Sequence, residues 1–248
     1  MSASNRTHEQ FPAPTGPYKV ELRNRRSWQQ APEARLQISV GRPGVDGDKL
    51  FALCEWAAAR FPRVVLVVSD TLQRHNLVFE RGLDVDCANA ESRREGDEWL
   101  ERNRLAIALL RNPEILRWDD ALQEPRTAPA LEKLERHYAA SSQFRVALDA
   151  TIEAFWSRNA SKGGIDTSSK HDRFQDNSRA FLFEELAVFA WLCQRDGLDV
   201  YPGSWMESIF TALRAENDHF FDAFRKDWVQ VDYTRNRAFA CYRHQLAA

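Results

Sequence analysis

The fold of this chain is decided between residues 36 and 69, where the sequence is LQISVGRPGVDGDKLFALCEWAAARFPRVVLVVS. Residues 36–40 alternate apolar and polar side chains, as a strand does, and the glycines and proline that follow predict a loop. Residues 48–60 have helical periodicity, and residues 64–68 are an apolar, β-branched run typical of a strand buried on both faces. Strand, helix and buried strand make a βαβ unit, so we predict an α/β protein with a parallel sheet.

The remaining sequence is mostly helical in pattern. Periodicity predicts helices over residues 88–111, 131–158 and 173–193, a short strand over 198–201, and further helix to about residue 242. The proline-containing stretch 113–130 predicts a connection with at most short helices. We expect a mobile N-terminal arm over residues 1–32 and one catalytic domain over residues 33–248.

Composition narrows the functional class. The 248 residues carry a formal net charge of −2, so an RNA-binding site has to come from local clusters of arginine. The four cysteines include no CxxC pair, which favours free thiols in a reducing compartment. The first thirty residues contain no apolar core of a secretory signal, and no run approaches the roughly 18 apolar residues of a membrane span. We therefore expect a cytoplasmic protein that does not enter a membrane.

Ser39 is the first candidate for chemistry. It lies at the carboxyl end of the first predicted strand, directly before a glycine-rich loop, and ligands bind at this edge of parallel sheets. From this position alone, Ser39 is either a nucleophile or a residue that merely ends a strand. The loop has neither the G-x-G-x-x-G nor the G-K-[ST] spacing of phosphate-binding loops, and no G-x-S-x-G nucleophile elbow is present.

Arginines recur along the predicted helix 88–111. At 100° per residue, Arg93, Arg104 and Arg111 fall within about 20° of one another and form one stripe. Such a stripe suits an RNA phosphate backbone. Interspersed carboxylates make a solvated, ion-paired helix face the alternative.

Two consecutive carboxylates, Glu184 and Glu185, interrupt an otherwise apolar helix. A helix that is apolar on every side is buried, so at least one of them is expected to face the interior. A buried carboxylate needs a cationic partner or keeps its proton. That partner is either a substrate ammonium or an arginine of the fold, and the residues alone leave both open.

Three segments together resemble the cyclodipeptide synthases. The strand end at Ser39 resembles the catalytic serine of that family, and residues 69–76 with 88–104 resemble its second-strand loop and basic helix. Phe183-Glu184-Glu185-Leu186 followed by Val200-Tyr201-Pro202 resembles its third signature, and the Tyr-Pro pair is that of one of its two subgroups. The segments occur in family order.

The resemblance implies a Rossmann-like parallel sheet with helices on both faces, similar to the catalytic domains of class I tyrosyl- and tryptophanyl-tRNA synthetases. It implies an aminoacyltransferase that takes amino acids from two aminoacyl-tRNAs and closes them into a 2,5-diketopiperazine through a serine-bound intermediate. Because the amino acids arrive as activated esters and the chain has no HIGH-type motif, the resemblance implies no ATP. We expect no cofactor, no metal and a monomer.

The resemblance also assigns residues to roles. Ser39, Glu185 and Tyr201 are the catalytic candidates: Ser39 takes the first aminoacyl group, Glu185 holds the substrate amino group, and Tyr201 relays a proton during cyclisation. The candidates for substrate binding are Phe181, Glu184 and Gly41, and those for tRNA binding are Arg93, Arg94, Arg102, Arg104 and Arg111. The family usually has tyrosine where this chain has Phe181, so either Glu185 binds the ammonium without that hydroxyl or Glu184 is the relevant carboxylate.

Two other functional classes remain open. One is a non-catalytic RNA-binding module on the same fold. The other is a tRNA-independent serine esterase, which requires His75, His171 or His219 near Ser39.

Overall fold

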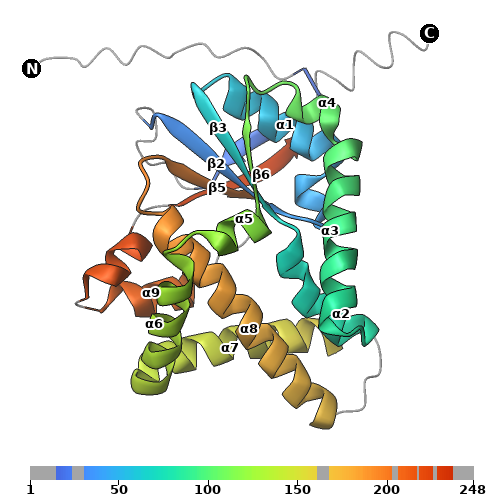
Figure 1. The fold of residues 1–248 in the computed structure, drawn as a ribbon. Helices are drawn as coiled ribbons and strands as arrows, with labels where there is room; N and C mark the ends of the chain where they lie inside the picture. Colours follow the sequence, from blue (N-terminus) through green and yellow to red (C-terminus); the bar gives the residue numbers. More distant parts are fainter. Residues whose placement is uncertain are drawn as a thin grey trace, which may run out of the picture.

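A computed structural model describes residues 15–23, 31–160, 168–202, 206–216, 218–225 and 228–236. The described residues form one six-stranded sheet with helices on both sides (Figure 1). Its strands are β1 (Tyr18–Leu22), β2 (Glu33–Ser39), β3 (Arg63–Ser69), β4 (Glu114–Arg117), β5 (Leu198–Pro202) and β6 (Trp228–Arg235).

The strand order is β1-β6-β5-β2-β3-β4. All neighbours are parallel except β1 and β6, which run antiparallel, so the predicted parallel sheet is confirmed for five strands and extended by one antiparallel edge strand. The chain leaves β2 toward β3 on one side, whereas β5 lies on the other side. The sheet therefore has its topological switch point at β2, where α/β proteins bind ligands beyond the carboxyl ends of the strands.

Two apolar cores lie on opposite faces of the sheet. On one face, Leu36, Ile38 and Leu66 pack against the helices α1 (Gly47–Ala58), α3 (Val85–Arg102) and α4 (Arg104–Ile107). On the other face, Val65 and Val67 pack against a larger helical layer. This alternation explains the sequence pattern of β3, because a strand covered on both faces needs apolar side chains at every position.

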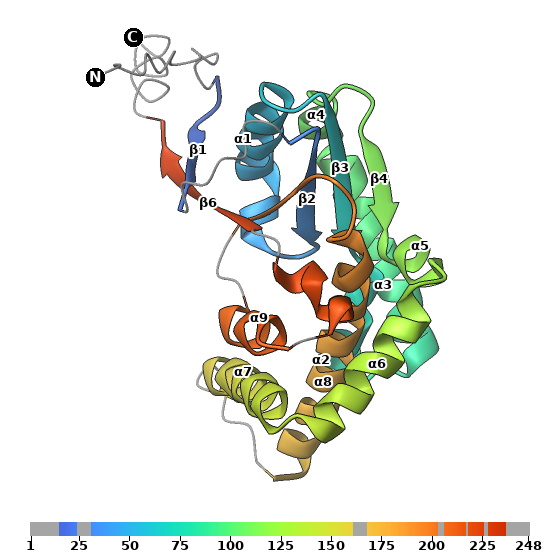
Figure 2. The ribbon, with the colours of Figure 1, turned by 90° about the vertical axis from the view of Figure 1, so that its left-hand side faces the viewer.

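The larger layer extends beyond the carboxyl ends of the strands, toward which β2, β3 and β4 point in Figure 2. Its helices are α2 (Arg74–Arg81), α5 (Trp118–Gln123), α6 (Thr127–Ala140), α7 (Ser142–Ala160), α8 (Ser168–Leu192) and α9 (Glu207–Arg214). Three short 3-10 turns complete the described elements: η1 (Pro43–Val45), η2 (Thr71–Gln73) and η3 (His219–Arg225). Throughout the described ranges, every helix is too short or too polar to cross a lipid bilayer.

The sequence-based prediction of the elements was wrong in places where pairing or packing is non-local. Residues 18–22, placed in the N-terminal arm, form β1, because β6 supplies their hydrogen-bond partners. Residues 228–235, predicted to be helical, form β6, and residues 114–117, predicted to be a connection, form β4 beside β3. The predicted helix 131–158 is two helices that separate at Ser141. The rest of the predicted arm, residues 1–14 and 24–30, lies outside the described residues.

Candidate active site

Ser39 is the last residue of β2 and opens a tight turn. The Arg42 backbone N–H donates to the Ser39 carbonyl at 3.1 Å, and Gly41 at the third position of the turn has φ 88°. A left-handed conformation at that position favours glycine, because residues with a side chain rarely adopt it. The turn directs the chain back over the sheet edge and places Arg42 close to Ser39. The predicted substrate-binding role of Gly41 stays a prediction, whereas its role in the turn is structural.

The loop after this turn is fastened to the end of α3. The Trp99 indole donates to the Val45 carbonyl at 2.9 Å, and the Gly47 backbone N–H donates to the Asn103 side-chain oxygen at 2.9 Å. Arg102 forms an ion pair with Asp46, with an N–O distance of 2.9 Å. These contacts attach residues 45–47 to the end of α3 at the switch point.

Tyr201 reaches the same place from β5, the strand beside β2. Its hydroxyl accepts a hydrogen bond of 2.5 Å from the Arg42 guanidinium and also hydrogen-bonds with the Ser39 side chain. The residue is 8% exposed. Burial raises the pKa of the Tyr201 phenol, and the charge of Glu185 adds to the rise, whereas Arg42 and Ser39 oppose it. The phenol is therefore protonated at neutral pH and able to donate.

Glu185 approaches these groups from α8. Burial raises the pKa of its carboxyl from 4.5 to about 7, and the positive charge of Arg42 opposes the rise. Among the described residues, no group donates a hydrogen bond to this carboxylate, and Glu185 remains partly accessible. Ser39, Arg42, Glu185 and Tyr201 thus form one group, which we call the Arg42 cluster.

Glu184 belongs to a different group, the Arg74 cluster of Arg74, His75, Trp118 and Glu184. Arg74 contacts both carboxylate oxygens, the Trp118 indole donates to one at 2.6 Å, and His75 lies 3.2 Å from the other. Burial raises the pKa of the Glu184 carboxyl, but the hydrogen bonds from His75 and Arg74 outweigh this effect and keep the pKa below its usual value. Glu184 has donors from the fold itself. Its predicted contact with substrate stays a prediction.

Phe181 lies one helical turn before Glu185 on α8. It is partly buried, and its ring meets the His75 ring edge-on with centroids 6.3 Å apart. It therefore lies beside the Arg74 cluster. Its predicted contact with substrate stays a prediction.

A buried ion-pair network aligns the two strands that carry Ser39 and Tyr201. Arg35 on β2 is fully buried and binds both carboxylate oxygens of Asp199 on β5 at 2.8 and 2.7 Å. The Gln37 side chain donates to the same carboxylate at 3.0 Å. Because side chains alternate along a strand, Arg35, Gln37 and Ser39 share one face, so this network fixes the register directly below Ser39 and Tyr201. The sequence analysis missed the network, because a single charged residue in an apolar strand does not identify its partner.

Similarity to known proteins was found in the structure of this chain. The sequence matches no protein-family model and no curated protein. A cyclodipeptide synthase from Fluoribacter dumoffii is similar to this chain with a TM-score of 0.76 and 23% identity, covering 88% of this chain and 100% of that one. The chain has the fold of the cyclodipeptide synthases.

Two other solved structures share this fold. A cyclodipeptide synthase from Candidatus Glomeribacter gigasporarum, bound to Phe-tRNAPhe, has a TM-score of 0.60 and 15% identity over 82% of this chain and 88% of that one. A Mycobacterium tuberculosis protein, described as relating cyclodipeptide synthetases to type I tRNA synthetases, has a TM-score of 0.55 and 14% identity over 93% of this chain and 98% of that one. The expected Rossmann-like α/β fold is confirmed.

Within this cyclodipeptide-synthase fold, the arginine stripe predicted on one continuous helix is wrong. The helix α3 ends at Arg102, Asn103 separates it from α4, and Arg111 follows the end of α4. The 100° spacing therefore does not carry through from Arg93 to Arg104 and Arg111. The reason is tertiary: the Asn103 side chain turns to receive the Gly47 N–H and to donate to the Trp99 carbonyl, which ends the helix there.

The predicted tRNA-binding arginines are instead exposed residues, and four of the five have acidic partners. Arg93 pairs with Asp119, Arg94 with Glu91 and Glu98, Arg102 with Asp46, and Arg104 with Glu101, while Arg111 is exposed after α4. Each exposed pair contributes little to stability. An RNA phosphate is able to replace the carboxylate in such a pair, so these arginines stay candidates for RNA binding.

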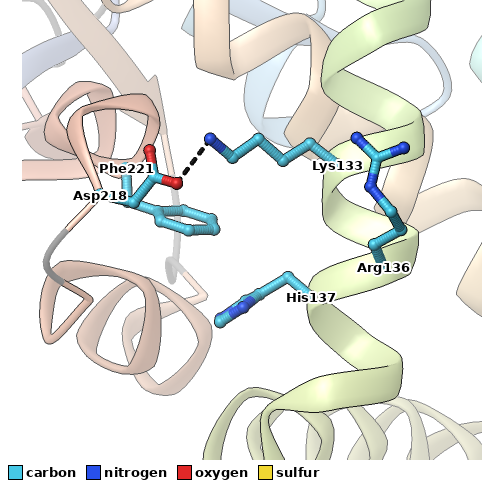
Figure 3. Close-up of a pocket in the computed structure, with 5 residues that line it drawn as sticks. All are labelled: Lys133, Arg136, His137, Asp218 and Phe221. Atoms are coloured by element: carbon cyan, nitrogen blue, oxygen red, sulfur yellow. Dashed lines mark ion pairs between the residues drawn. The ribbon is translucent and has the colours of Figure 1, made fainter.

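A cavity of about 340 Å³ lies elsewhere, between α6 and η3. Lys133, Arg136, His137, Asp218 and Phe221 line it (Figure 3). Its walls share no residue with the Arg42 cluster, and Lys133 is already paired with Asp218 at 2.6 Å. We therefore do not assign the reaction to this cavity.

The histidines that an esterase requires contact carboxylates, and no hydrogen bond among the described residues joins any of them to Ser39. His75 contacts Glu184, His171 lies 2.9 Å from Glu153, and His219 lies 3.1 Å from Asp222. In the described part of the chain, no cluster of three or more His, Cys, Asp or Glu side chains has the arrangement of a metal site. The expectation of a reaction without metal or cofactor stays a prediction.

Proposed function

We propose that this protein is a tRNA-dependent cyclodipeptide synthase in which Ser39 carries the growing product. The observation that supports the proposal most is the meeting of a strand-end serine, a buried phenol and a carboxylate at the switch point of this fold. The Tyr201-Pro202 pair is that of the Tyr-Pro subgroup, to which we assign the chain.

In the first step, the Ser39 oxygen attacks the carbonyl of an aminoacyl-tRNA ester. A new ester bond to Ser39 forms, the bond to the terminal ribose oxygen breaks, and that oxygen takes the serine proton. One ester replaces another, so the step is nearly balanced in energy and needs no ATP. This balance fits a site without an obvious histidine base beside Ser39.

Glu185 is the residue that we assign to the substrate amino group. With a pKa of about 7, its carboxyl is close to half ionised at neutral pH. A bound ammonium stabilises the ionised form, and the buried surroundings strengthen that attraction. Because no described residue donates to this carboxylate, the ammonium need not displace a partner from the fold.

The later steps form two amide bonds. The amine of aminoacyl-Ser39 attacks the carbonyl of the second aminoacyl-tRNA ester, the bond to the terminal ribose oxygen breaks, and that oxygen takes a proton from the amine, which leaves a dipeptidyl ester on Ser39. The free amine of this dipeptide then attacks the ester carbonyl, the bond to Ser39 breaks, and the cyclic dipeptide departs. The serine oxygen needs a proton at that moment, and Tyr201 is hydrogen-bonded to Ser39 and protonated at neutral pH, so it gives its proton to that oxygen and recovers one from the attacking amine.

Trapping the intermediate tests the proposal. Wild-type protein incubated with labelled aminoacyl-tRNA is expected to gain one aminoacyl group on Ser39, seen by mass spectrometry of the intact protein and its peptides. Ser39→Ala is expected to gain none and to make no cyclic dipeptide when expressed in a bacterium. Ser69→Ala is the matched control, because Ser69 is the register partner of Ser39 at the end of β3.

Three other results would each contradict the proposal. Undiminished product from Ser39→Ala excludes the covalent route. RNA binding without acylation of the wild type identifies a non-catalytic RNA-binding module. Hydrolysis of simple esters without tRNA identifies an esterase.

The RNA contact is tested separately. Replacing Arg93, Arg104 or Arg111 with Gln is expected to weaken tRNA binding and to reduce the slope of log affinity against log salt by about one unit or less per contact. Arg136→Gln is the control, because Arg136 is an exposed arginine of α6 with its own acidic neighbour, Glu132. Equal slopes for all four variants and the wild type would remove these arginines from the RNA surface.

A further inference from the structure

Arg42 is a residue for which the sequence analysis proposed no role, and it stands at the centre of the Arg42 cluster. Its guanidinium donates to the Tyr201 hydroxyl at 2.5 Å and lies 5.9 Å from the centre of the Tyr201 ring. Its charge also acts on the Glu185 carboxyl. One cation thus reaches the two groups to which the proposed reaction assigns proton transfer and ammonium binding.

The position of Arg42 is built by the fold. The turn from Ser39 to Arg42 depends on the left-handed Gly41, and the residues that follow are held by Trp99, Arg102 and Asn103 at the end of α3. Arg42 is itself exposed, and among the described residues the contact with Tyr201 is the hydrogen bond that directs its side chain inward. An exposed arginine gains little from one neutral hydrogen bond, which makes a purely stabilising role a weak explanation.

The donors and acceptors of Arg42 and Tyr201 determine how the Tyr201 hydroxyl is oriented. A guanidinium has donors and no acceptor, whereas a tyrosine hydroxyl has one proton and two lone pairs. With Arg42 occupying one lone pair, the proton of Tyr201 points away from the guanidinium, and the neighbouring Ser39 oxygen is an acceptor for it once that oxygen is esterified and carries no proton of its own. This is the orientation in which Tyr201 protonates the serine oxygen as the product leaves.

The other charged groups around the cluster are already compensated. On β2 and β5, Arg35 and Asp199 bind each other, four residues before Ser39 and two residues before Tyr201. On α8, Glu184 is bound by Arg74 and His75 of α2 and by Trp118 of α5. Arg42 is therefore the cation of the described residues whose charge is directed at Glu185 and Tyr201.

We propose that Arg42 is a positioning residue of the reaction: it directs the Tyr201 proton toward Ser39 and supplies the positive charge that faces Glu185, where the substrate ammonium binds. This assignment rests on the proposed synthase activity. It gives Arg42 two separable contributions, a positive charge that acts on Glu185 and a planar donor that orients Tyr201.

Three substitutions separate the two contributions. Arg42→Lys keeps the charge, Arg42→Gln keeps a donor without charge, and Arg42→Met removes both. We expect the pH at which Glu185 loses its proton to rise by about one unit or more in Arg42→Gln and Arg42→Met, and to stay near wild type in Arg42→Lys. The readout is carbon NMR of protein labelled at the glutamate carboxyl carbons, with the Glu185 signal assigned from Glu185→Gln.

The activity readout uses the same variants. The pH profile of cyclic-dipeptide formation is expected to shift to higher pH in Arg42→Gln and Arg42→Met, and Arg42→Met is expected to lose at least tenfold in rate. A role limited to stabilising the loop would lower the yield without moving the profile. Circular dichroism identifies any variant that fails to fold, and Arg42→Lys and Arg42→Gln then carry the comparison.

The outcomes distinguish this inference from the proposed function. Wild-type product formation with an unchanged Glu185 titration and pH profile in Arg42→Met overturns the role of Arg42 and leaves the synthase activity standing. A shifted Glu185 titration in protein that makes no cyclic dipeptide from any aminoacyl-tRNA supports the electrostatic link but overturns both the synthase activity and the catalytic purpose of Arg42.

Discussion

Glu184 and Glu185 occupy consecutive positions on α8, yet their carboxylates meet opposite surroundings. In the Arg74 cluster, an arginine, an indole and a histidine surround Glu184, and its pKa stays below the usual value although burial opposes this. In the Arg42 cluster, Glu185 receives no hydrogen bond from the described residues, and burial raises its pKa to about 7. The two side chains differ by one position on the helix.

This difference separates a carboxylate that stabilises the fold from one that is available to a ligand. A buried carboxylate with all its donors is costly to disturb, because removal of one partner leaves a buried charge. A buried carboxylate without donors costs stability whenever it is ionised, and a ligand that brings a positive charge recovers that cost. Four predictions test this contrast, arranged by the expected change in the free energy of unfolding.

The largest effect is expected from Arg74→Met. This change leaves the Glu184 carboxylate buried without its cation and is expected to lower the free energy of unfolding by about 3–5 kcal/mol. Urea denaturation at pH 7 measures the change. Arg81→Met at the exposed end of α2 is the control and is expected to have a far smaller effect. Equal midpoints for the two variants would show that the Arg74 cluster is not a stabilising element.

Glu185→Gln is expected to raise the free energy of unfolding, by an amount that depends on pH. The folded-state pKa of about 7 lies above the unfolded value of 4.5, so the folded protein binds the proton more tightly and loses stability as the pH rises through this window. One pKa unit corresponds to about 1.4 kcal/mol, so the variant gains up to about 3 kcal/mol over the wild type at pH 8 and almost nothing below pH 4.5.

Urea denaturation of the wild type and of Glu185→Gln at several pH values measures the difference in their free energies of unfolding. The contributions of all other titrating groups cancel in this difference. Glu184→Gln serves as the matched neighbour and is expected to destabilise at neutral pH. A Glu185→Gln variant that is less stable than wild type at pH 8 would contradict the contrast between the two clusters.

A smaller effect is expected from Gly41→Ala. Glycine at φ 88° tolerates a conformation that costs an alanine about 1–2 kcal/mol, although the space around a new Cβ is open. The turn that presents Arg42 is expected to shift, so cyclic-dipeptide formation falls as well. Gly44→Ala is the control, because its Cβ meets Pro202 only at ordinary contact distance and its φ lies outside the left-handed range. Identical thermal unfolding of the two variants would show that the conformation of Gly41 in the turn imposes no cost on an alanine.

The smallest change in stability is expected from Tyr201→Phe. The ring stays packed and only the hydrogen bonds to Arg42 and Ser39 are lost, so the free energy of unfolding changes by about 1 kcal/mol. Chemistry is expected to suffer far more: aminoacyl-Ser39 forms, and cyclic product appears much more slowly. Intact-protein mass spectrometry and product analysis measure the two stages. Wild-type product yield would show that the proton reaches Ser39 by another route.

The local sequence pattern was sufficient to predict the central strands of the sheet and the residues at their carboxyl ends. The βαβ unit over residues 36–69 follows from alternation, helical period and a β-branched run, and Ser39 has to end its strand because breakers follow it. Pro202 restricts Tyr201 to extended geometry, and β5 forms there. These features depend on neighbours in the chain, so the sequence by itself determined them.

Only the tertiary structure decided which partners meet. The strand β6 forms because β5 and β1 supply its hydrogen bonds, although its own pattern did not identify a strand. The helix α3 ends at Arg102 because Asn103 bonds to a loop more than fifty residues away, which dissolves the predicted arginine stripe. Glu184 and Glu185 have the same chemistry in the sequence, and they differ because Arg74 and Trp118 reach one while Arg42 faces the other. Long-range contacts decide burial and charge pairing, and one-dimensional periodicity carries no record of them.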